Sequence, residues 1–226
     1  DAIMKYTSEH TCYQSSSLTF TPRKRRYTAN LLYVEDGVVF VRLGKTDIPV
    51  LNGQGFWLPF ECLHALTITP NTRVHQLAVS PRVTRTLPTQ VGHVEVSPLL
   101  VASLSALCTS AYQPSSSAQA HRLQAVVLDQ ISLMSPSQTL DRQTQSLADC
   151  VTRAQTGQPP ANAEQHYQLQ ALTQLTMEDL HEYFIVRQLR AALKSGQKLT
   201  KAATNIGIAH AQAESLYARY TDAFEA

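Results

Sequence analysis

Clusters of charged, histidine and cysteine side chains are the parts of this sequence that could carry chemistry. The densest is the run Arg23-Lys24-Arg25-Arg26, which suits a solvated loop, a nucleic-acid contact or the capture of an anionic ligand. We favour the solvated loop for most of the run. His64 and His75 could ligate a metal, but no His-x-His pair with a following Glu accompanies them, so no recognisable motif supplies three ligands. We therefore expect no metal and no cofactor, and a hydrogen-bonded role for each histidine.

The cysteines offer no paired spacing. Cys12, Cys62, Cys108 and Cys150 lie far apart, unlike the ligands of a zinc site or the two halves of a redox couple. We expect four reduced, mostly buried thiols. The sequence also lacks a Gly-x-Ser-x-Gly nucleophile turn, a phosphate-binding loop and a dinucleotide fingerprint. We expect that the protein is not an enzyme, while a metalloenzyme built on a small barrel stays open as an alternative that bound metal would reveal.

The composition is typical of a folded, soluble protein. The 226 residues are 43% hydrophobic, and 19 Lys and Arg nearly balance 17 Asp and Glu, which excludes extended disorder as the main state. No apolar run approaches the ~20 residues that a membrane-spanning helix needs. Residues 1–5 contain no hydrophobic secretory segment. We expect a cytoplasmic protein with no membrane partner.

Residues up to about Pro98 have the pattern of an all-β unit. Residues 30–44 predict a hairpin around Asp36-Gly37, because an Asp-Gly pair suits the positive φ angles of a tight turn. Further strands are expected at residues 47–51, 55–59, 65–69, 74–79 and 93–96. Strands every 8–12 residues or so are typical of sandwiches and small barrels. We predict a small antiparallel barrel.

After Pro98 the apolar residues change to a helical period. One stripe consists of Leu100, Leu104, Leu107 and Ala111. A second stripe consists of Leu123, Val126, Val127, Ile131 and Met134. Turn-forming residues 113–117 lie between them, so we predict a helical hairpin. Its apolar surface could pack against the barrel, form a homodimer contact, or do both.

From residue 140 onward the sequence is helical. Helices are expected at residues 143–155, 164–175, 177–194, 199–206 and 211–224, with a break at Gly157-Gln158-Pro159-Pro160. Short helices with short joints favour a helix-turn-helix, in which a helix pair braces one helix for the DNA major groove. The fold class we predict is α+β, with a barrel-and-hairpin domain at residues 1–137 and an all-α domain at residues 138–226.

The more specific helix-turn-helix candidate covers residues 199–224. Ala202 and Ala203 are small enough to let a second helix approach closely, and Gly207 can adopt the turn conformation that a side chain opposes. The helix after the turn would bury Leu216, Tyr220 and Phe224. Its outward polar residues are candidates for DNA contact: His210, Gln212, Ser215 and Arg219. An ordinary helical hairpin with an alanine-rich contact is the alternative explanation.

The other candidate covers residues 169–184. Thr176 can cap its second helix, in which Leu180 and Phe184 would face inward. Residues 177–184 contain three acids and no Lys or Arg, although neutralisation of phosphates by basic groups supplies most non-specific affinity for DNA. Residues 140–226 as a whole are close to neutral, unlike a typical DNA-binding domain.

The order of these segments resembles an AraC-type transcription regulator along nearly the whole chain. Residues 30–37 are similar to the family's first barrel hairpin, and residues 55–64, from Gly55-Phe56-Trp57 to His64, resemble its Trp-x-Pro…His strand and turn. Residues 96–100 resemble the start of its dimerisation helices. Leu175-Thr176 with Leu180 and Phe184 is similar to its first helix-turn-helix, and residues 199–208 to its second. The stretch between Phe184 and Gly196 is about a dozen residues shorter than in the family.

The resemblance implies a cupin-like barrel for a small-molecule effector and dimerisation, followed by helix-turn-helix units for DNA. Candidate effector-binding residues are Tyr33, Arg42, Trp57 and His64, because a small-ligand site needs an aromatic floor with a few polar groups. Arg26 and Tyr27 stand where relatives carry histidines, which argues against a metal-binding cupin. The neutral charge and the short linker favour an alternative, a ligand-sensing or protein-interaction module that has lost DNA binding and acts through a partner protein.

Overall fold

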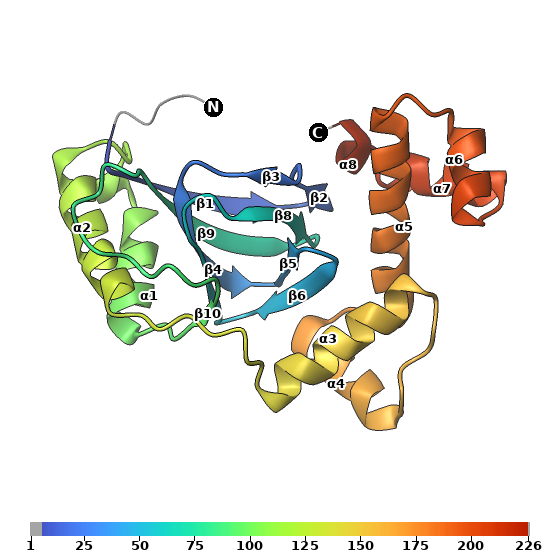
Figure 1. Cartoon of the computed structure of the whole chain (residues 1–226), viewed down its shortest axis with the longest axis horizontal. Helices are drawn as coiled ribbons and strands as arrows, with labels where there is room; N and C mark the ends of the chain where they lie inside the picture. The colour runs from blue at the N-terminus through green and yellow to red at the C-terminus, as the bar shows by residue number, and fades with distance from the viewer. Residues whose placement is uncertain (1–5, 226) are drawn as a thin grey trace.

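The computed structural model describes residues 6–225 and has an α+β architecture of two antiparallel sheets and helices on both flanks (Figure 1). Residues 1–5, to which part of the cytoplasmic expectation refers, lie outside the described residues. Among the described residues, no helix has the length and apolar character that crossing a bilayer requires.

Each sheet is assembled from strands that are distant in sequence. The first sheet has the order β1 (Ser8–Ser15), β9 (Thr72–Val79), β4 (Ala29–Asp36), β7 (Gly55–Leu58) and β10 (Gly92–Val94). The second has the order β2 (Thr19–Phe20), β8 (Leu63–Ile68), β5 (Val38–Leu43) and β6 (Thr46–Leu51), and β3 (Lys24–Arg25) also pairs with β8. The strand segments expected at residues 47–51, 55–59, 65–69, 74–79 and 93–96 correspond to β6, β7, β8, β9 and β10.

The two sheets pack face to face, because side chains alternate across each strand. The layer between the sheets is filled by apolar side chains, among them Leu32, Phe56 and Val74 from the first sheet and Val41 and Leu66 from the second. The sheets are not closed into a barrel, so the predicted closed barrel was wrong. Alternating apolar residues specify which face of a strand is buried, but they do not specify whether the last strand pairs with the first.

The Asp36-Gly37 turn does not form the predicted hairpin. β4 pairs with β9 and β7, whereas β5 pairs with β6 and β8, so this turn carries the chain from one sheet to the other. Gly37 has φ +89°, and a Cβ there would meet Thr72. The Thr72 hydroxyl accepts a hydrogen bond from the Val38 amide at 3.2 Å. A close crossing of two strands, rather than a two-residue hairpin, therefore explains the glycine.

The helical hairpin covers the outer face of the first sheet, on the left of Figure 1. It consists of α1 (Pro98–Leu107), capped by Ser97, and α2 (Ala118–Ser132), capped by Ser117. Leu104 and Val127 are buried in one cluster with Trp57 and Leu77 of the sheet. Packing of the hairpin onto the sheet, one of the two expected roles, is present.

The remaining helices form a group beside the second sheet, on the right of Figure 1. They are α3 (Arg142–Gln155), α4 (Ala163–Thr173), α5 (Met177–Lys194), α6 (Leu199–Ile206), α7 (His210–Arg219) and α8 (Thr221–Glu225). The helices expected at 177–194 and 199–206 match α5 and α6. The single helix expected at 211–224 was wrong, because the backbone leaves the helix at Tyr220, whose hydroxyl donates to Glu182 at 2.9 Å.

The helical half and the second sheet share one apolar cluster. Phe40 of β5 lies against Phe184 of α5 with ring centroids 6.1 Å apart, and both belong to a buried set that extends to Leu216 of α7. The division at residue 137 falls in the irregular segment between α2 and α3, where Ser137 pairs with His93. The division into two domains remains a prediction, since one apolar cluster contains residues from both sides of residue 137.

Candidate functional site

The structure does not bring the four predicted effector residues together. Tyr33 and Trp57 lie on the outer face of the first sheet, beneath α1 and α2, and Trp57 is fully buried with its indole N–H donating to the Pro88 carbonyl at 2.8 Å. His64 is buried at the start of β8, and burial lowers its pKa. Arg42 lies on the outer face of the second sheet, where it contacts Asp47.

Arg42 lines a cleft of about 410 Å³ between the second sheet and α5. Arg23 of the basic run borders the same cleft, together with Arg187 and Arg190 of α5. Other lining residues come from both sides: Phe20, Thr21, Pro22, Ala65, Leu66, Thr67, Gln155, Gln188 and Ala191. We call this hollow the arginine cleft. Guanidinium groups around a partly apolar floor can hold an anionic group and pack the body of its carrier, and two of these four, Arg42 and Arg187, also bind Asp47.

A buried carboxylate binds three of the residues that line the arginine cleft. The Asp47 side chain has 0% exposure and accepts hydrogen bonds from Arg187 at 2.6 and 3.0 Å, from Arg42 at 2.7 Å and from Gln155 at 2.5 Å. These three partners come from α5, β5 and α3. Asp47 therefore connects the second sheet to the helical half. Sequence patterns do not predict this connection, because the two partners in the helical half, Gln155 and Arg187, are 108 and 140 residues away.

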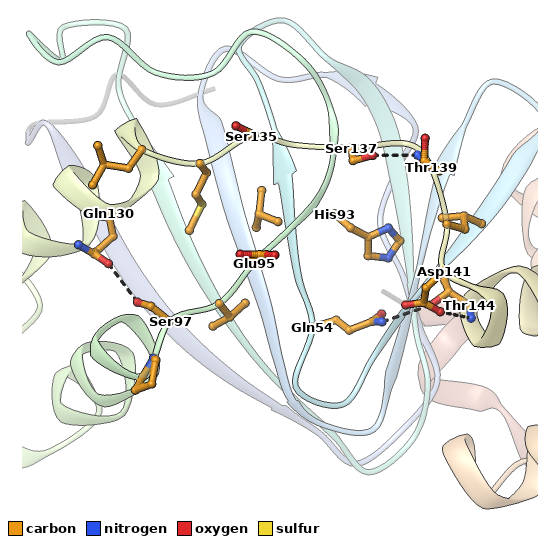
Figure 2. A pocket seen from close by; sticks show the side chains of 16 residues that line it. Gln54, His93, Glu95, Ser97, Gln130, Ser135, Ser137, Thr139, Asp141 and Thr144 are labelled. Carbon is orange, nitrogen blue, oxygen red and sulfur yellow. Dashed lines mark hydrogen bonds between the residues drawn. The ribbon is translucent and has the colours of Figure 1, made fainter.

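A larger hollow, of about 950 Å³, lies where the segment between α2 and α3 crosses the end of the first sheet (Figure 2). Ser97 donates to Gln130 at 3.0 Å on one side, and Gln54 donates to Thr144 at 3.3 Å on the other. Glu95 lies in the middle of the view. We call this hollow the junction groove.

The junction groove and the arginine cleft have opposite electrostatic character. The groove is lined by Glu95 and Asp141 and by several hydroxyl and amide groups, with no Lys or Arg in its lining. The pKa of Asp141 is lowered, chiefly because its carboxylate accepts the backbone N–H of Thr144 as the cap of α3. The pKa of His93, which faces Asp141, is lowered mainly by burial. Of the two hollows, only the arginine cleft offers positive charge to an anion.

The C-terminal helices form a compact helix-turn-helix. α6 ends at Ile206, Gly207 adopts a left-handed conformation with φ +88°, and α7 begins at His210 after three intervening residues. Ala202 and Ala203 are buried, as are Ala213 and Leu216 of α7. A pair of helices joined by three or four residues that include glycine is the form of this motif in DNA-binding proteins.

The candidate DNA-contacting residues lie on the solvent side of α7. His210, Gln212, Ser215 and Arg219 are all exposed. Two of them form ion pairs with acidic residues: His210 with Glu214 at 3.1 Å and Arg219 with Glu182 of α5 at 2.9 Å. Gln212 and Ser215 therefore carry the polar surface, while Glu182 draws the Arg219 guanidinium toward the protein.

The structure also gathers histidines and cysteines that the sequence analysis left apart. On the outer face of the first sheet, His75 of β9 lies close to His10 of β1 and Cys108 at the end of α1, and also to Cys12 of β1 and Glu35 of β4. Burial, with His75 nearby, lowers the pKa of His10 to about 4. The alternation of Ser8, His10 and Cys12 along one strand was the available signal, but the partners on β9 and α1 depend on tertiary structure.

Comparisons with known proteins find structural neighbours only. No protein-family model matches, and no curated protein is similar. ToxT from Vibrio cholerae aligns over 95% of this chain and 95% of its own, with 10% identity and a TM-score of 0.38. A cupin superfamily protein from Desulfitobacterium hafniense aligns over 34% of this chain and 71% of its own, with 9% identity and a TM-score of 0.32. At these values the likenesses assign neither a family nor a function to this chain.

Proposed function

We propose that the protein is a transcription regulator of the AraC type, in which α6 and α7 bind DNA and a small anionic effector binds in the arginine cleft. The observation that carries this proposal is the double role of α5. Arg187 and Arg190 line the cleft, whereas Tyr183 and Glu182 of the same helix contact Tyr220 and Arg219 at the end of the helix-turn-helix. α5 would thus connect the effector site directly to the helix-turn-helix that binds the duplex.

The DNA-binding part of the proposal rests on the left-handed Gly207 turn and the exposed polar face of α7. Lys198 and Lys201, near the start of α6, are also exposed and could neutralise phosphates beside the recognition helix. Gln212 and Ser215 are the groups we assign to base edges, because amides and hydroxyls can donate and accept in the major groove.

The effector we propose is a small carboxylate with an apolar body. The arginine side chains of the cleft would hold the carboxylate, and the floor near Phe20 and Leu66 would contact the body. Since the cleft is bounded by the second sheet on one side and α5 on the other, a ligand there favours whichever placement of α5 contacts it best. That differential contact is the physical requirement for coupling the two sites.

We further propose that the hairpin α1–α2 forms the contact of a homodimer. Its outward surface retains exposed apolar side chains, with Leu99 51% exposed, Val126 36% and Leu133 78%. A second copy would cover these groups and present two helix-turn-helix units to two half-sites. Sedimentation of the protein, and of a Leu133→Glu variant that should be monomeric, tests this contact.

Fluorescence anisotropy with the promoter next to the protein's own gene tests DNA binding. We expect sequence-specific, salt-dependent affinity that falls about tenfold in Gln212→Ala, because one bidentate base contact contributes ~1–3 kcal/mol. Gln145→Ala, an exposed glutamine on α3, is the matched control and should bind like the parent. Affinity that ignores both DNA sequence and salt would count against the proposal.

Thermal shift and calorimetry with a panel of aliphatic and aromatic carboxylates test the effector site. Arg190→Gln should weaken binding of the best carboxylate about tenfold, because a charge-assisted hydrogen bond contributes roughly 1.5–3 kcal/mol. Arg122→Gln, an exposed arginine on α2, should leave binding unchanged. Equal losses in the two variants would remove the cleft from the proposal.

The pairing of His210 and Arg219 with carboxylates favours one alternative, a sensor that acts through a partner protein instead of DNA. Glu182→Gln separates the two functions. If the helix-turn-helix binds DNA, release of Arg219 should tighten DNA binding severalfold. The slope of log affinity against log salt concentration should become steeper by up to about one unit, because one more charge neutralises a phosphate. No DNA binding in either form of the protein would favour the partner-binding alternative.

A further inference from the structure

Four potential metal ligands converge on the outer face of the first sheet, away from both hollows discussed above. His10 and Cys12 are two residues apart on β1 and therefore point to the same face of the sheet. His75 on β9 is the cross-strand partner of Cys12. Cys108 caps the C-terminal end of α1, directly above them. His10 and His75 are 4% and 1% exposed, whereas the two cysteines are partly exposed.

The distances suit a single small cation. His10 Nε2 lies 3.1 Å from His75 Nδ1, and Cys108 Sγ lies 3.8 Å from the same nitrogen. Ligand atoms of a tetrahedral zinc ion, at about 2.0–2.3 Å from the metal, are about 3.3–3.8 Å from one another. Cys12 belongs to a second set, in which its thiol, a Glu35 carboxylate oxygen and a His75 ring nitrogen lie within 4.8 Å of one another, so it is the candidate for a fourth ligand.

A carboxylate orients the central histidine. Glu35 Oε2 lies 2.5 Å from His75 Nε2, and the same oxygen accepts a hydrogen bond from Arg73 Nε at 3.0 Å. When the His75 Nε2–H group donates a hydrogen bond to Glu35, the ring lone pair is on Nδ1. Nδ1 is the nitrogen that faces His10 and Cys108. Metal-binding histidines in proteins commonly have this outer carboxylate partner, which fixes the tautomer and the ring orientation.

The cluster is accessible from solvent. A hollow of about 440 Å³ is lined by His10, Cys12 and Cys108, with Arg73, Gln113 and Ser115 around them. A hydrated ion could therefore reach the cluster without opening the apolar layer beneath α1 and α2.

We propose that His10, Cys12, His75 and Cys108 form a binding site for a Zn²⁺ ion. Two thiolates and two imidazoles are the donor set of many zinc sites, and borderline-soft Zn²⁺ prefers them to the oxygen ligands that Ca²⁺ and Mg²⁺ require. The bound ion would tie the end of α1 to β1 and β9 and so stabilise the helical hairpin on its sheet. The proposal does not depend on DNA or effector binding.

Zinc titration of the whole, reduced and metal-stripped protein, in competition with a chromophoric chelator, tests the site. We expect one tightly bound Zn²⁺ per chain and at least a tenfold loss of affinity in Cys108→Ser, with Cys62→Ser as the matched, partly exposed cysteine control. Substitution with Co²⁺ should give the visible bands of tetrahedral coordination and a thiolate charge-transfer band, which Cys12→Ser and Cys108→Ser each weaken.

Glu35→Gln keeps all four ligands and alters only the orienting carboxylate. It should lower zinc affinity by about tenfold or more while circular dichroism shows an intact fold. Sub-stoichiometric zinc, equal losses in the Cys108→Ser and Cys62→Ser variants, or a Co²⁺ spectrum without thiolate bands would overturn the proposal.

Discussion

The two sheets are covered by helices in different ways. The hairpin α1–α2 lies on the first sheet (Figure 1). Its contacts are mainly apolar, with Leu104 and Val127 in one cluster with Trp57 and Leu77, and a buried hydrogen bond from Ser8 to Gln124 joins β1 to α2. The helical half lies on the second sheet through an apolar contact beside a buried charge, because Asp47 is held between arginines of β5 and α5.

This difference concerns specificity more than strength. Apolar surfaces attract without strong directionality, so a small shift of α1 and α2 loses packing contacts but leaves no buried charge unpaired. A carboxylate removed from water needs its hydrogen bonds at defined positions, and any displacement of α5 that breaks them leaves an unpaired buried charge. The interface next to the arginine cleft is therefore the one that permits few discrete arrangements, as a switch requires.

Asp47→Ala should have the largest effect, because it leaves Arg42 and Arg187 without their carboxylate. We expect the free energy of unfolding to fall by about 4 kcal/mol. Urea denaturation followed by circular dichroism measures the change. The matched control is Asp129→Ala, which removes the partner of Arg85 in a pair whose carboxylate is 64% exposed and should cost less than about 1 kcal/mol. Similar losses in the two variants would abolish the distinction between the interfaces.

Leu104→Ala should have the next largest effect, since this side chain is 1% exposed between α1 and the first sheet. A loss of about 3 kcal/mol is expected from the lost transfer free energy and the cavity left behind. Leu99→Ala on the same helix, where the side chain is 51% exposed, should change stability by less than about 0.5 kcal/mol. If Leu104→Ala proved as mild as Leu99→Ala in the same denaturation assay, the hairpin would not be held by this apolar contact.

Acidification should have a smaller effect, through histidines removed from water, such as the partly buried His93 at the edge of the first sheet. Burial lowers the pKa of His93 despite its hydrogen bond to the Pro49 carbonyl and the nearby charge of Asp141. The unfolded chain therefore binds the proton more readily, so this contribution is complete above the unfolded pKa of about 6.5 and declines as the pH falls below it.

Denaturation at about pH 7.5 and about pH 5.5 should show this decline, and His93→Gln should make it shallower. Other buried histidines act in the same direction, so the slope should persist in part. The exposed His166→Gln is the control and should keep the parent's pH dependence. An unchanged slope in His93→Gln would show that its ring does not titrate in this range.

Local pattern was sufficient to predict most elements. The period of apolar residues located α5 and α6 at their observed bounds, and Thr176 caps α5 as expected, in a reciprocal arrangement with Asp179. Pairing was harder to predict. Asp36-Gly37 has the composition of a hairpin turn, but β4 and β5 on its two sides pair with other strands instead of with each other. The choice among possible partner strands depends on packing across the sheets, which the local sequence does not reveal.

The candidate sites divide in the same way. Arg42 was predicted as a binding residue, and the structure places it in a cleft, but with Arg187 and Arg190 instead of with Tyr33, Trp57 and His64. The exposure of Gln212 and Ser215 followed from helical spacing alone.

The amino-acid sequence by itself determined where most of the strands and helices form, because those depend on neighbours a few residues apart. The tertiary structure decided which sheet each strand joins, which carboxylate meets which arginine, and that His10, Cys12, His75 and Cys108 share one place. Burial and hydrogen bonding act on groups that are close in space, and residues separated by 30 to 140 positions become neighbours only when the whole chain has packed.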